Sequence, residues 1–271
     1  IDSQDFAGSD FKAVSFPTGM ISNGLHFTPD TDLSKKSVNF LESLTGLNIL
    51  GPAREIPPVT FEQGQIKEFL GFGDNTPSFY EEIKFFTART RRELLVPSYE
   101  WTQALTQKFQ GEYLSKSYVT KFEMADNKVV SVTINGSKSI CALNFIYCGP
   151  VKALARLMPE KALSQRTRTK LAKNTYWSAL YVDFCHSQII SESSAMNILN
   201  GTTSDDIGPC AGQFQTPVEN LQTSQWITFV EDDTEEESET IAQSLKKMKR
   251  QIKRAYPEAM ENLKVERIRW A

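Results

Sequence analysis

The sequence of 271 residues predicts an α+β fold, a mixed α/β arrangement in which helices pack on an antiparallel sheet and a β-meander precedes it. Three observations lead to this prediction. Strand-like segments cluster in the middle and the last third of the chain, an Asn-Gly turn joins two of them, and a long amphipathic helix precedes the last strand.

The first third of the chain predicts one helix between loop-rich segments. Residues 11–29 place glycines and prolines among aromatic and apolar residues, which is typical of a tight turn and an irregular strand. Asp32 can cap a helix that Gly46 stops. The apolar face of this helix would consist of Leu33, Phe40, Leu41 and Leu44. Residues 46–75 are rich in Gly and Pro, so we expect loops with a short strand near residues 59–61.

Two more helices and a meander follow. Thr76-Pro77 places proline at a first helical position, and Ser98 can cap a helix that ends at Gly111. The meander would contain a strand at 119–122, a turn at 126–127, an alternating strand at 129–134, the Asn-Gly turn at 135–136 and an apolar strand at 140–147. Because the last strand is almost entirely apolar, we expect it to be buried on both faces.

The last third predicts one antiparallel sheet and the long helix. The expected strands are residues 177–184, 196–199, 225–230 and 265–270. Thr234 and Glu237 have the spacing of a capping box, and Pro257 ends the helix. Its apolar stripe consists of Ile241, Leu245, Met248, Ile252 and Tyr256.

Composition excludes several classes of function. The net charge of -3 and the pI of about 5.6 argue against nucleic-acid binding. No apolar run is long enough for a membrane span. The four cysteines form no CxxC pair and the chain has two distant histidines, so we expect no metal site and reduced core thiols in a cytoplasmic protein.

No complete catalytic motif is present, because the sequence lacks GxGxxG, GxxxxGK[ST], GxSxG and HExxH. Cys185 and His186 are neighbours in a predicted strand, so their side chains should point to opposite faces, and we expect a structural histidine there. His26 lies next to a glycine-containing turn that permits close approach of the backbone to a ligand.

Residues 16–27, FPTGMISNGLHF, resemble a "G-F-x-F-D-x-G-x-H" segment of FAD-dependent amine-oxidase-like enzymes, a family that includes protoporphyrinogen oxidases, phytoene desaturases and monoamine oxidases. In that family the segment lies beside the flavin ring and the substrate cavity. The resemblance therefore implies a catalytic position for His26 and a cofactor-binding position for Gly24. The acidic residue of the family is absent, and Ser22 or Asn23 falls near its place.

A second part of the resemblance covers residues 96–159. The family has paired glycines at the start of a helix, where this chain has Ser98 and Tyr99. The strand and hairpin that follow match a region of the family that contacts the adenine of FAD. The implied cofactor-binding positions there are Val119, Cys148, Gly149 and Pro150.

The resemblance implies three segments. Residues 1–95 would follow the flavin-proximal turn as a substrate and helical region, residues 96–158 would be part of an FAD-binding domain, and residues 159–271 would form a substrate domain. The two segments that anchor FAD in the family, a glycine fingerprint and a Gly-Asp segment, have no match in the sequence. We therefore expect an internal portion of such a protein, with FAD bound by the intact protein and not by this chain alone.

The expected function of the intact protein is oxidation of an organic small molecule by hydride transfer to flavin, with this portion inactive on its own. Two alternatives remain open at this point. The first is a non-catalytic binding module that keeps the flavoprotein fold, which the replaced glycines favour. The second is an unrelated α+β hydrolase, although the sequence assembles no nucleophile, base or metal set for it.

Overall fold

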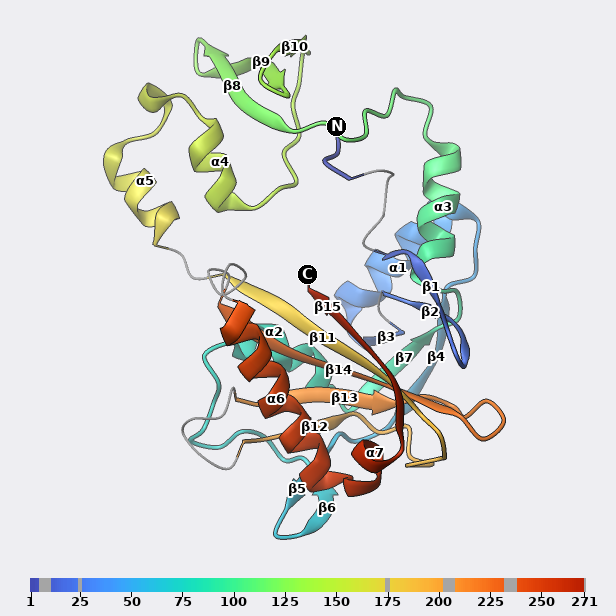
Figure 1. Cartoon of the computed structure of the whole chain (residues 1–271). Helices are drawn as coiled ribbons and strands as arrows, with labels where there is room; N and C mark the ends of the chain where they lie inside the picture. Colours follow the sequence, from blue (N-terminus) through green and yellow to red (C-terminus); the bar gives the residue numbers. More distant parts are fainter. Residues whose placement is uncertain (5–10, 24–25, 174–175, 202–207, 232–237, 271) are drawn as a thin grey trace. The chain divides into compact units, whose positions relative to one another are not determined.

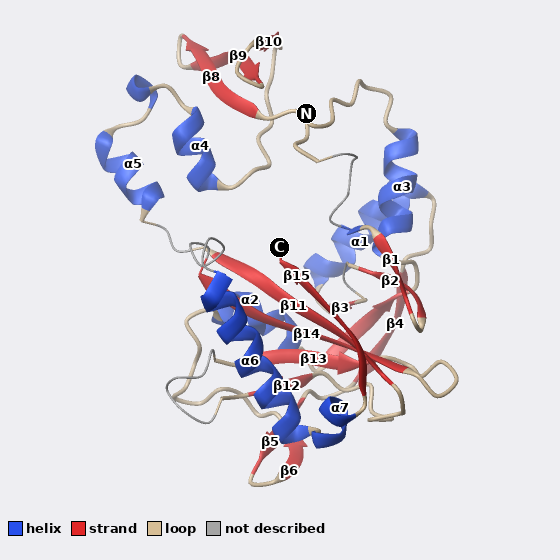
Figure 2. Ribbon diagram, viewed as in Figure 1, coloured by secondary structure: helices blue, strands red, loops and turns tan. Residues whose placement is uncertain are grey.

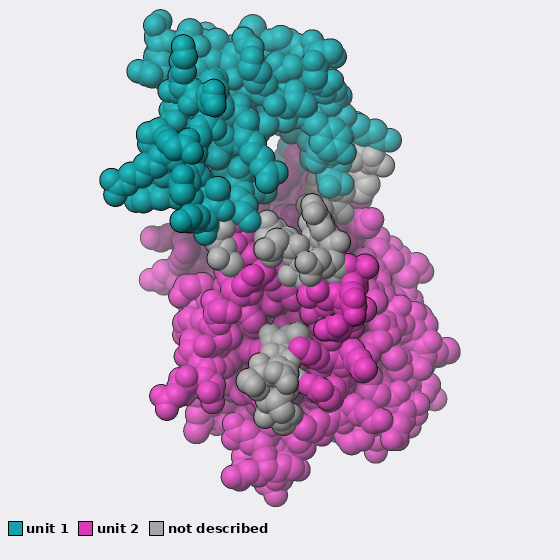
Figure 3. Space-filling view, turned by 60° about the vertical axis from the view of Figure 1, so that its left-hand side comes forward, with its two compact units in different colours: residues 1–9, 106–175 teal, residues 10–105, 176–271 magenta. Residues whose placement is uncertain are grey.

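A computed structural model of the chain describes residues 1–271 except residues 5–10, 24–25, 174–175, 202–207, 232–237 and 271 (Figure 1). Helices and mostly antiparallel strands alternate along it, which confirms the α+β prediction (Figure 2). The chain divides into two compact units, residues 1–9 with 106–175 and residues 10–105 with 176–271 (Figure 3). Each unit has its own core.

The first unit contains the predicted β-meander. Its antiparallel strands are β8 (Val119–Ala125), β9 (Lys128–Ile134) and β10 (Lys138–Cys141), followed by α4 (Val151–Leu157), the 3-10 helix η3 (Glu160–Ala162) and α5 (Gln165–Ala172). Asp126 and Asn127 turn the chain with positive φ angles of 49° and 60°, and Asn135 and Gly136 do so with 50° and 73°. Both predicted turns are confirmed, because these residue types tolerate the left-handed region.

The apolar strand predicted at 140–147 is wrong beyond Cys141. Residues 142–147 form a loop, in which Leu143 is 98% exposed and Ile146 is 91% exposed. In the described chain no strand pairs with this segment, and only some of its apolar side chains, such as Phe145 and Tyr147, pack against the core of the meander. The expectation of core thiols is likewise wrong for Cys141 and Cys148, which are exposed, whereas all four cysteines are free as predicted.

The second unit is built on a seven-stranded sheet with the order β15-β11-β14-β13-β12-β5-β6. Its strands are β5 (Val59–Glu62), β6 (Gln65–Glu68), β11 (Trp177–His186), β12 (Asn197–Leu199), β13 (Cys210–Phe214), β14 (Gln222–Glu231) and β15 (Leu263–Trp270). All neighbours are antiparallel except β12 and β5. The predicted sheet is confirmed, and β13 is an addition that the sequence pattern did not indicate.

Helices α6 (Ser238–Ala255) and α7 (Pro257–Glu261) cover one face of this sheet (Figure 1). Met248 and Ile252 of the predicted stripe are fully buried against Leu180 and Phe184. Pro257 ends α6 and opens α7, where a missing backbone N–H is harmless. The predicted capping pair, Thr234 and Glu237, lies outside the described residues.

The opposite face packs against residues of β3 (Phe27–Pro29), α2 (Tyr80–Ile83) and η2 (Lys84–Thr87). The other elements from this part of the chain are the hairpin β1 (Ala13–Phe16) and β2 (Gly19–Ser22), β7 (Thr90–Leu94) and β4 (Leu50–Glu55), which form a sheet with β3, and the helices α1 (Asp32–Thr45) and α3 (Ser98–Lys108). Phe79, Ile83, Ile198 and Phe229 are buried in this second core. None of the described helices has the length and apolar character required to cross a membrane.

Helix boundaries in this region differ from the prediction in detail. Thr31, not Asp32, caps α1, since its Oγ1 accepts a hydrogen bond from the Ser34 N–H at 3.1 Å, while Gly46 ends the helix at φ 78° as expected. The predicted apolar face is wrong, because Leu33 is 76% exposed and Val38 is buried instead. Ser98 is the first residue of α3, and the helix predicted at Thr76-Pro77 begins at residue 80.

Candidate functional site

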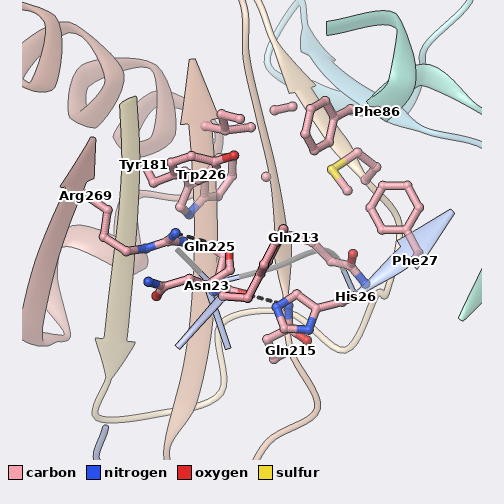
Figure 4. Close-up of a pocket in the computed structure, with 15 residues that line it drawn as sticks. Asn23, His26, Phe27, Phe86, Tyr181, Gln213, Gln215, Gln225, Trp226 and Arg269 are labelled. Carbon is pink, nitrogen blue, oxygen red and sulfur yellow. Dashed lines mark hydrogen bonds between the residues drawn. The ribbon is translucent and has the colours of Figure 1, made fainter. Parts of the chain in front are cut away.

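A pocket of about 140 Å³ opens on the sheet face away from α6 (Figure 4). Phe27, Phe86, Tyr181 and Ile227 give it an apolar wall, and Asn23, His26, Gln213, Gln215, Gln225 and Arg269 give it a polar one. The two walls contain residues far apart in the sequence, because the sheet brings the first thirty residues beside the last strand. Such a concave site with a few convergent polar groups is the usual form of a small-molecule site.

Strand register explains why these side chains share one face. Tyr181 on β11 faces Ile227 on β14 and Arg269 on β15 in the register, and two residues along β11, Asp183 faces Gln225 and Arg267. Because side chains alternate across a strand, both rows point to the pocket face. The intervening residues of β11 belong to the core under α6.

Asp183 is the centre of a buried polar cluster. Its carboxylate is fully buried and accepts hydrogen bonds from Gln225 Nε2 at 3.1 Å, Arg267 Nη1 at 3.3 Å, and Arg269 Nε and Nη2 at 3.0 and 3.2 Å. Two guanidinium groups and an amide therefore offset the loss of hydration of one carboxylate. Arg269 also lies over the ring of Tyr181, with its Cζ 4.3 Å from the ring centroid.

Asn23 attaches the turn after β2 to this cluster. Its side-chain oxygen accepts a hydrogen bond from Arg267 Nη2 at 2.7 Å, and its backbone carbonyl accepts one from Arg269 Nη1 at 3.3 Å. The two arginines thus hold Asn23, three residues before His26, against the sheet. Gly24, the predicted cofactor contact next to Asn23 in the sequence, lies outside the described residues.

His26 lines the pocket with an unpaired nitrogen. Its Nε2 atom is buried and has no hydrogen-bond partner in the described part of the chain. Burial lowers the pKa of His26 below 6.5, although a hydrogen bond with Gln225 and the charge of Asp183 oppose this shift. The imidazole is therefore neutral at neutral pH, and Nε2 can pair with a group that enters the pocket.

A second pocket of about 240 Å³ shares His26, Gln215 and Gln225 with the first. The β1–β2 hairpin forms its other side and is attached to the sheet by Thr18, whose Oγ1 lies 2.6 Å from Thr223 Oγ1. The three shared residues therefore border two spaces of different character, one with aromatic walls and one lined by Thr18, Met20, Ile21 and Ser22 of the hairpin.

The remaining predicted site residues belong to the other compact unit. Val119 begins β8, an edge strand of the meander, so one side of its backbone has no strand partner among the described residues. Cys148, Gly149 and Pro150 form an exposed segment before α4, in which the Tyr147 hydroxyl donates to the Pro150 carbonyl at 2.9 Å. Their role in cofactor binding stays a prediction.

His186 is a structural residue, as the sequence predicted. It is fully buried, with Nδ1 3.0 Å from the Ala259 carbonyl and Nε2 2.8 Å from Ser224 Oγ. The Ala259 carbonyl can only accept, so Nδ1 carries the ring proton and Nε2 accepts from the Ser224 hydroxyl, whose oxygen also accepts from Trp226 Nε1 at 2.9 Å. Both ring nitrogens therefore have hydrogen-bond partners within the protein, so neither is free to bind a substrate.

Sequence reasoning missed Asp183, Arg267 and Arg269. A signal was present, because Asp183 is the one acidic residue in the apolar strand segment 177–185 and the two arginines are spaced by two in a strand pattern. A carboxylate within an apolar strand needs a charged partner, and an Arg-x-Arg spacing places two cations on one face. Within the described residues, no group of His, Cys, Asp or Glu is gathered as a metal site requires.

No family model matches the sequence, and a search of curated proteins also finds no match. Solved structures match the fold. An oxidoreductase from Methanosarcina mazei aligns with a TM-score of 0.68 and 10% identity over 98% of this chain and 80% of that chain. Wild-type putrescine oxidase bound to putrescine aligns with a TM-score of 0.64 and 11% identity over 98% of this chain and 77% of that chain. Cyclohexylamine oxidase from Brevibacterium oxydans IH-35A aligns with a TM-score of 0.64 and 10% identity over 100% of this chain and 78% of that chain. The chain therefore has the fold of these oxidoreductases.

Proposed function

We propose that this chain provides the substrate-binding part of a flavin-dependent oxidoreductase that oxidises an organic small molecule. The fold likeness to amine oxidases supports the class of protein. The single observation that carries the proposal is the buried and unpaired Nε2 atom of His26 at the border of two pockets. A neutral imidazole in that position suits a ligand edge on one side and a cofactor ring on the other.

The residues present suit the flavin ring and the adenine of FAD better than its pyrophosphate. The unpaired His26 nitrogen suits the edge of a flavin ring, and the open edge of β8 at Val119 suits a backbone contact to adenine. The sequence has no GxGxxG cradle for the pyrophosphate. When bound, FAD would supply the acceptor for a hydride.

The chain's own residues would position the substrate. The aromatic wall of Phe27, Phe86 and Tyr181 would exclude water from the reacting bond. Arg269 is fixed by Asp183 and Asn23, so it would present its remaining N–H groups in a defined direction. His26 would hold a hydrogen bond at Nε2 without carrying a charge.

The three-segment division remains part of this proposal. Residues 1–95 and 159–271 would form the substrate region, and residues 96–158 would contribute to FAD binding, with Cys148, Gly149 and Pro150 near the adenine side. We expect a small organic molecule as the partner and no nucleic acid, given the net charge of -3.

A non-catalytic binding module is the second candidate, and one observation favours it. Ser98 occupies a position where the family has glycine, and its buried hydroxyl pairs with the hydroxyl of Ser22. The side chain thus fills space against the chain's own hairpin, where glycine would leave room for a cofactor. A binding module would keep the pocket and lack the flavin.

The test is the flavin content and spectrum of the protein purified at its natural length. We expect visible flavin absorbance that changes on substitution of His26→Leu and changes less for His26→Gln, whose amide can replace Nε2. Lys36→Gln, on the exposed surface of α1, is the matched control and should leave the spectrum unchanged. A colourless protein that rejects added FAD would support the binding module instead.

A further inference from the structure

The charged groups around the pocket are unbalanced. Beneath its polar wall, Arg267 and Arg269 are both paired with the buried Asp183. His26 adds no positive charge, because burial keeps it neutral. The cluster therefore carries one surplus positive charge.

A third guanidinium lies behind the apolar wall. The Arg91 Cζ is 4.9 Å from the centroid of the Phe27 ring, and Phe27 lines the pocket. Arg91 is 5% exposed, its Nη2 donates to the Ser194 carbonyl at 3.3 Å, and its Nη1 has no partner among the described residues. Its charge adds to the positive potential at the pocket, since buried charges are weakly screened.

Asp183 has no capacity left for a cationic ligand. A carboxylate offers about four lone-pair positions, and Gln225, Arg267 and Arg269 supply four donors to its two oxygens. It is also fully buried and absent from the pocket lining. An ammonium group that entered this pocket would meet the surplus charge of Arg269 without a free carboxylate.

Arg269, in contrast, has donors to spare. Its Nε, Nη1 and Nη2 each give one hydrogen bond to Asp183 or Asn23. A guanidinium has five N–H groups in all, so two remain without a partner in the described chain. Arg269 lines the pocket, as does His26 with its unpaired Nε2.

From these contacts we infer that the pocket selects an organic anion: a molecule with one apolar ring or short chain and a terminal carboxylate. The carboxylate would pair with Arg269, and the apolar part would pack against Phe27, Phe86 and Ile227. This specificity differs from that of putrescine and cyclohexylamine oxidases, which are named for amines. The inference rests on the proposal that this pocket is the substrate site.

Three probes of one shape test the inference: 3-phenylpropionate, 3-phenylpropanol and 3-phenylpropylamine. They differ in the terminal group alone, and their binding to the purified protein can be followed by calorimetry at about pH 7.5, where the acid and the amine are both charged. We expect the carboxylate to bind at least ~10-fold more tightly than the alcohol, and the amine to bind more weakly than the alcohol. Equal or tighter binding of the amine, or binding of none of the three, would overturn the inference.

Substitutions test whether Arg269 causes the preference for a carboxylate ligand. Arg269→Gln should reduce the preference for carboxylate over alcohol to within about 3-fold, and Lys249→Gln, which removes an equal charge on the other sheet face, should leave it intact. If Arg269→Gln fails to fold, the wild-type probe series still decides the question. Flavin content is measured on the same samples. A preference for the anion in a protein without flavin would support this inference and contradict the proposed oxidoreductase. Bound flavin together with a preference for the amine would support the oxidoreductase and contradict this inference.

Discussion

Arg269 donates two hydrogen bonds to the buried carboxylate of Asp183, from Nε to Oδ2 at 3.0 Å and from Nη2 to Oδ1 at 3.2 Å. The two residues are 86 positions apart and come from the adjacent strands β15 and β11. A third nitrogen of the same guanidinium reaches the backbone of Asn23. The guanidinium of Arg269 therefore links the last strand to its neighbour β11 and to Asn23.

Asp183→Asn should destabilise the second unit by about 3 kcal/mol, because two half-buried guanidinium groups lose their buried charged acceptor while the shape is kept. Equilibrium urea unfolding measures this loss. The matched control is Glu266→Gln, which breaks the more exposed pair with Lys249 and should cost under about 1 kcal/mol. Equal losses for the two variants would contradict the role assigned to Asp183.

Gly212→Ala should destabilise the sheet by about 3 kcal/mol, toward the upper end of overpacking effects. A Cβ at this position on β13 would lie 2.1 Å from the Trp226 ring, and the ring is buried. Gly64→Ala is the comparison, since it has open space and a φ of 79° and should cost about 1 kcal/mol from conformation alone. A smaller loss at Gly212 than at Gly64 would mean that the tryptophan moves freely.

Acid should weaken the fold from about pH 6.5 downward. Burial lowers the folded-state pKa of both His26 and His186 below 6.5, so the unfolded chain binds protons more readily than the folded one. The stability contribution is complete above pH 6.5 and is lost as the pH falls through the lowered folded-state values. Urea unfolding at a series of pH values measures this slope.

His186→Gln should reduce that slope between pH 6.5 and pH 5, because one of the two titrating groups is removed. A slope that is unchanged in this variant, or stability that rises on acidification in the wild type, would contradict the buried neutral state of the histidines. Carboxylates also contribute at lower pH, so the comparison is restricted to the range above about pH 5.

His26→Leu should weaken binding of 3-phenylpropionate by about 10-fold, whereas His26→Gln should weaken it less, because the carboxylate only accepts hydrogen bonds and needs an N–H at Nε2 that a glutamine amide can replace. The leucine removes the polar atom that faces the pocket, and glutamine can restore a hydrogen bond at that place. Calorimetry of both variants provides the comparison. Equal affinity in His26→Leu and wild type would show that Nε2 faces no ligand.

Local features of the fold follow from the sequence, and the site does not. The turns at 126–127 and 135–136 and the stripe of α6 are set by residues close in the chain, so pattern and spacing predict them. The loop at 142–147 and the exposed face of α1 depend on what packs against them, which the pattern of one segment cannot show. The pairing of Asp183 with Arg269 depends on strand order, because β15 pairs with β11 and not with β14, the strand that precedes it in the sequence, and such an order is not local information.

The visible absorption spectrum of the protein at its natural length, after titration with FAD, tests the central claim most directly. The proposed function predicts saturable uptake of flavin with absorption bands shifted from those of free FAD, and a further shift when His26 is replaced by leucine. Protein that stays colourless at saturating FAD, while the pocket still binds 3-phenylpropionate, would contradict it and identify a binding module.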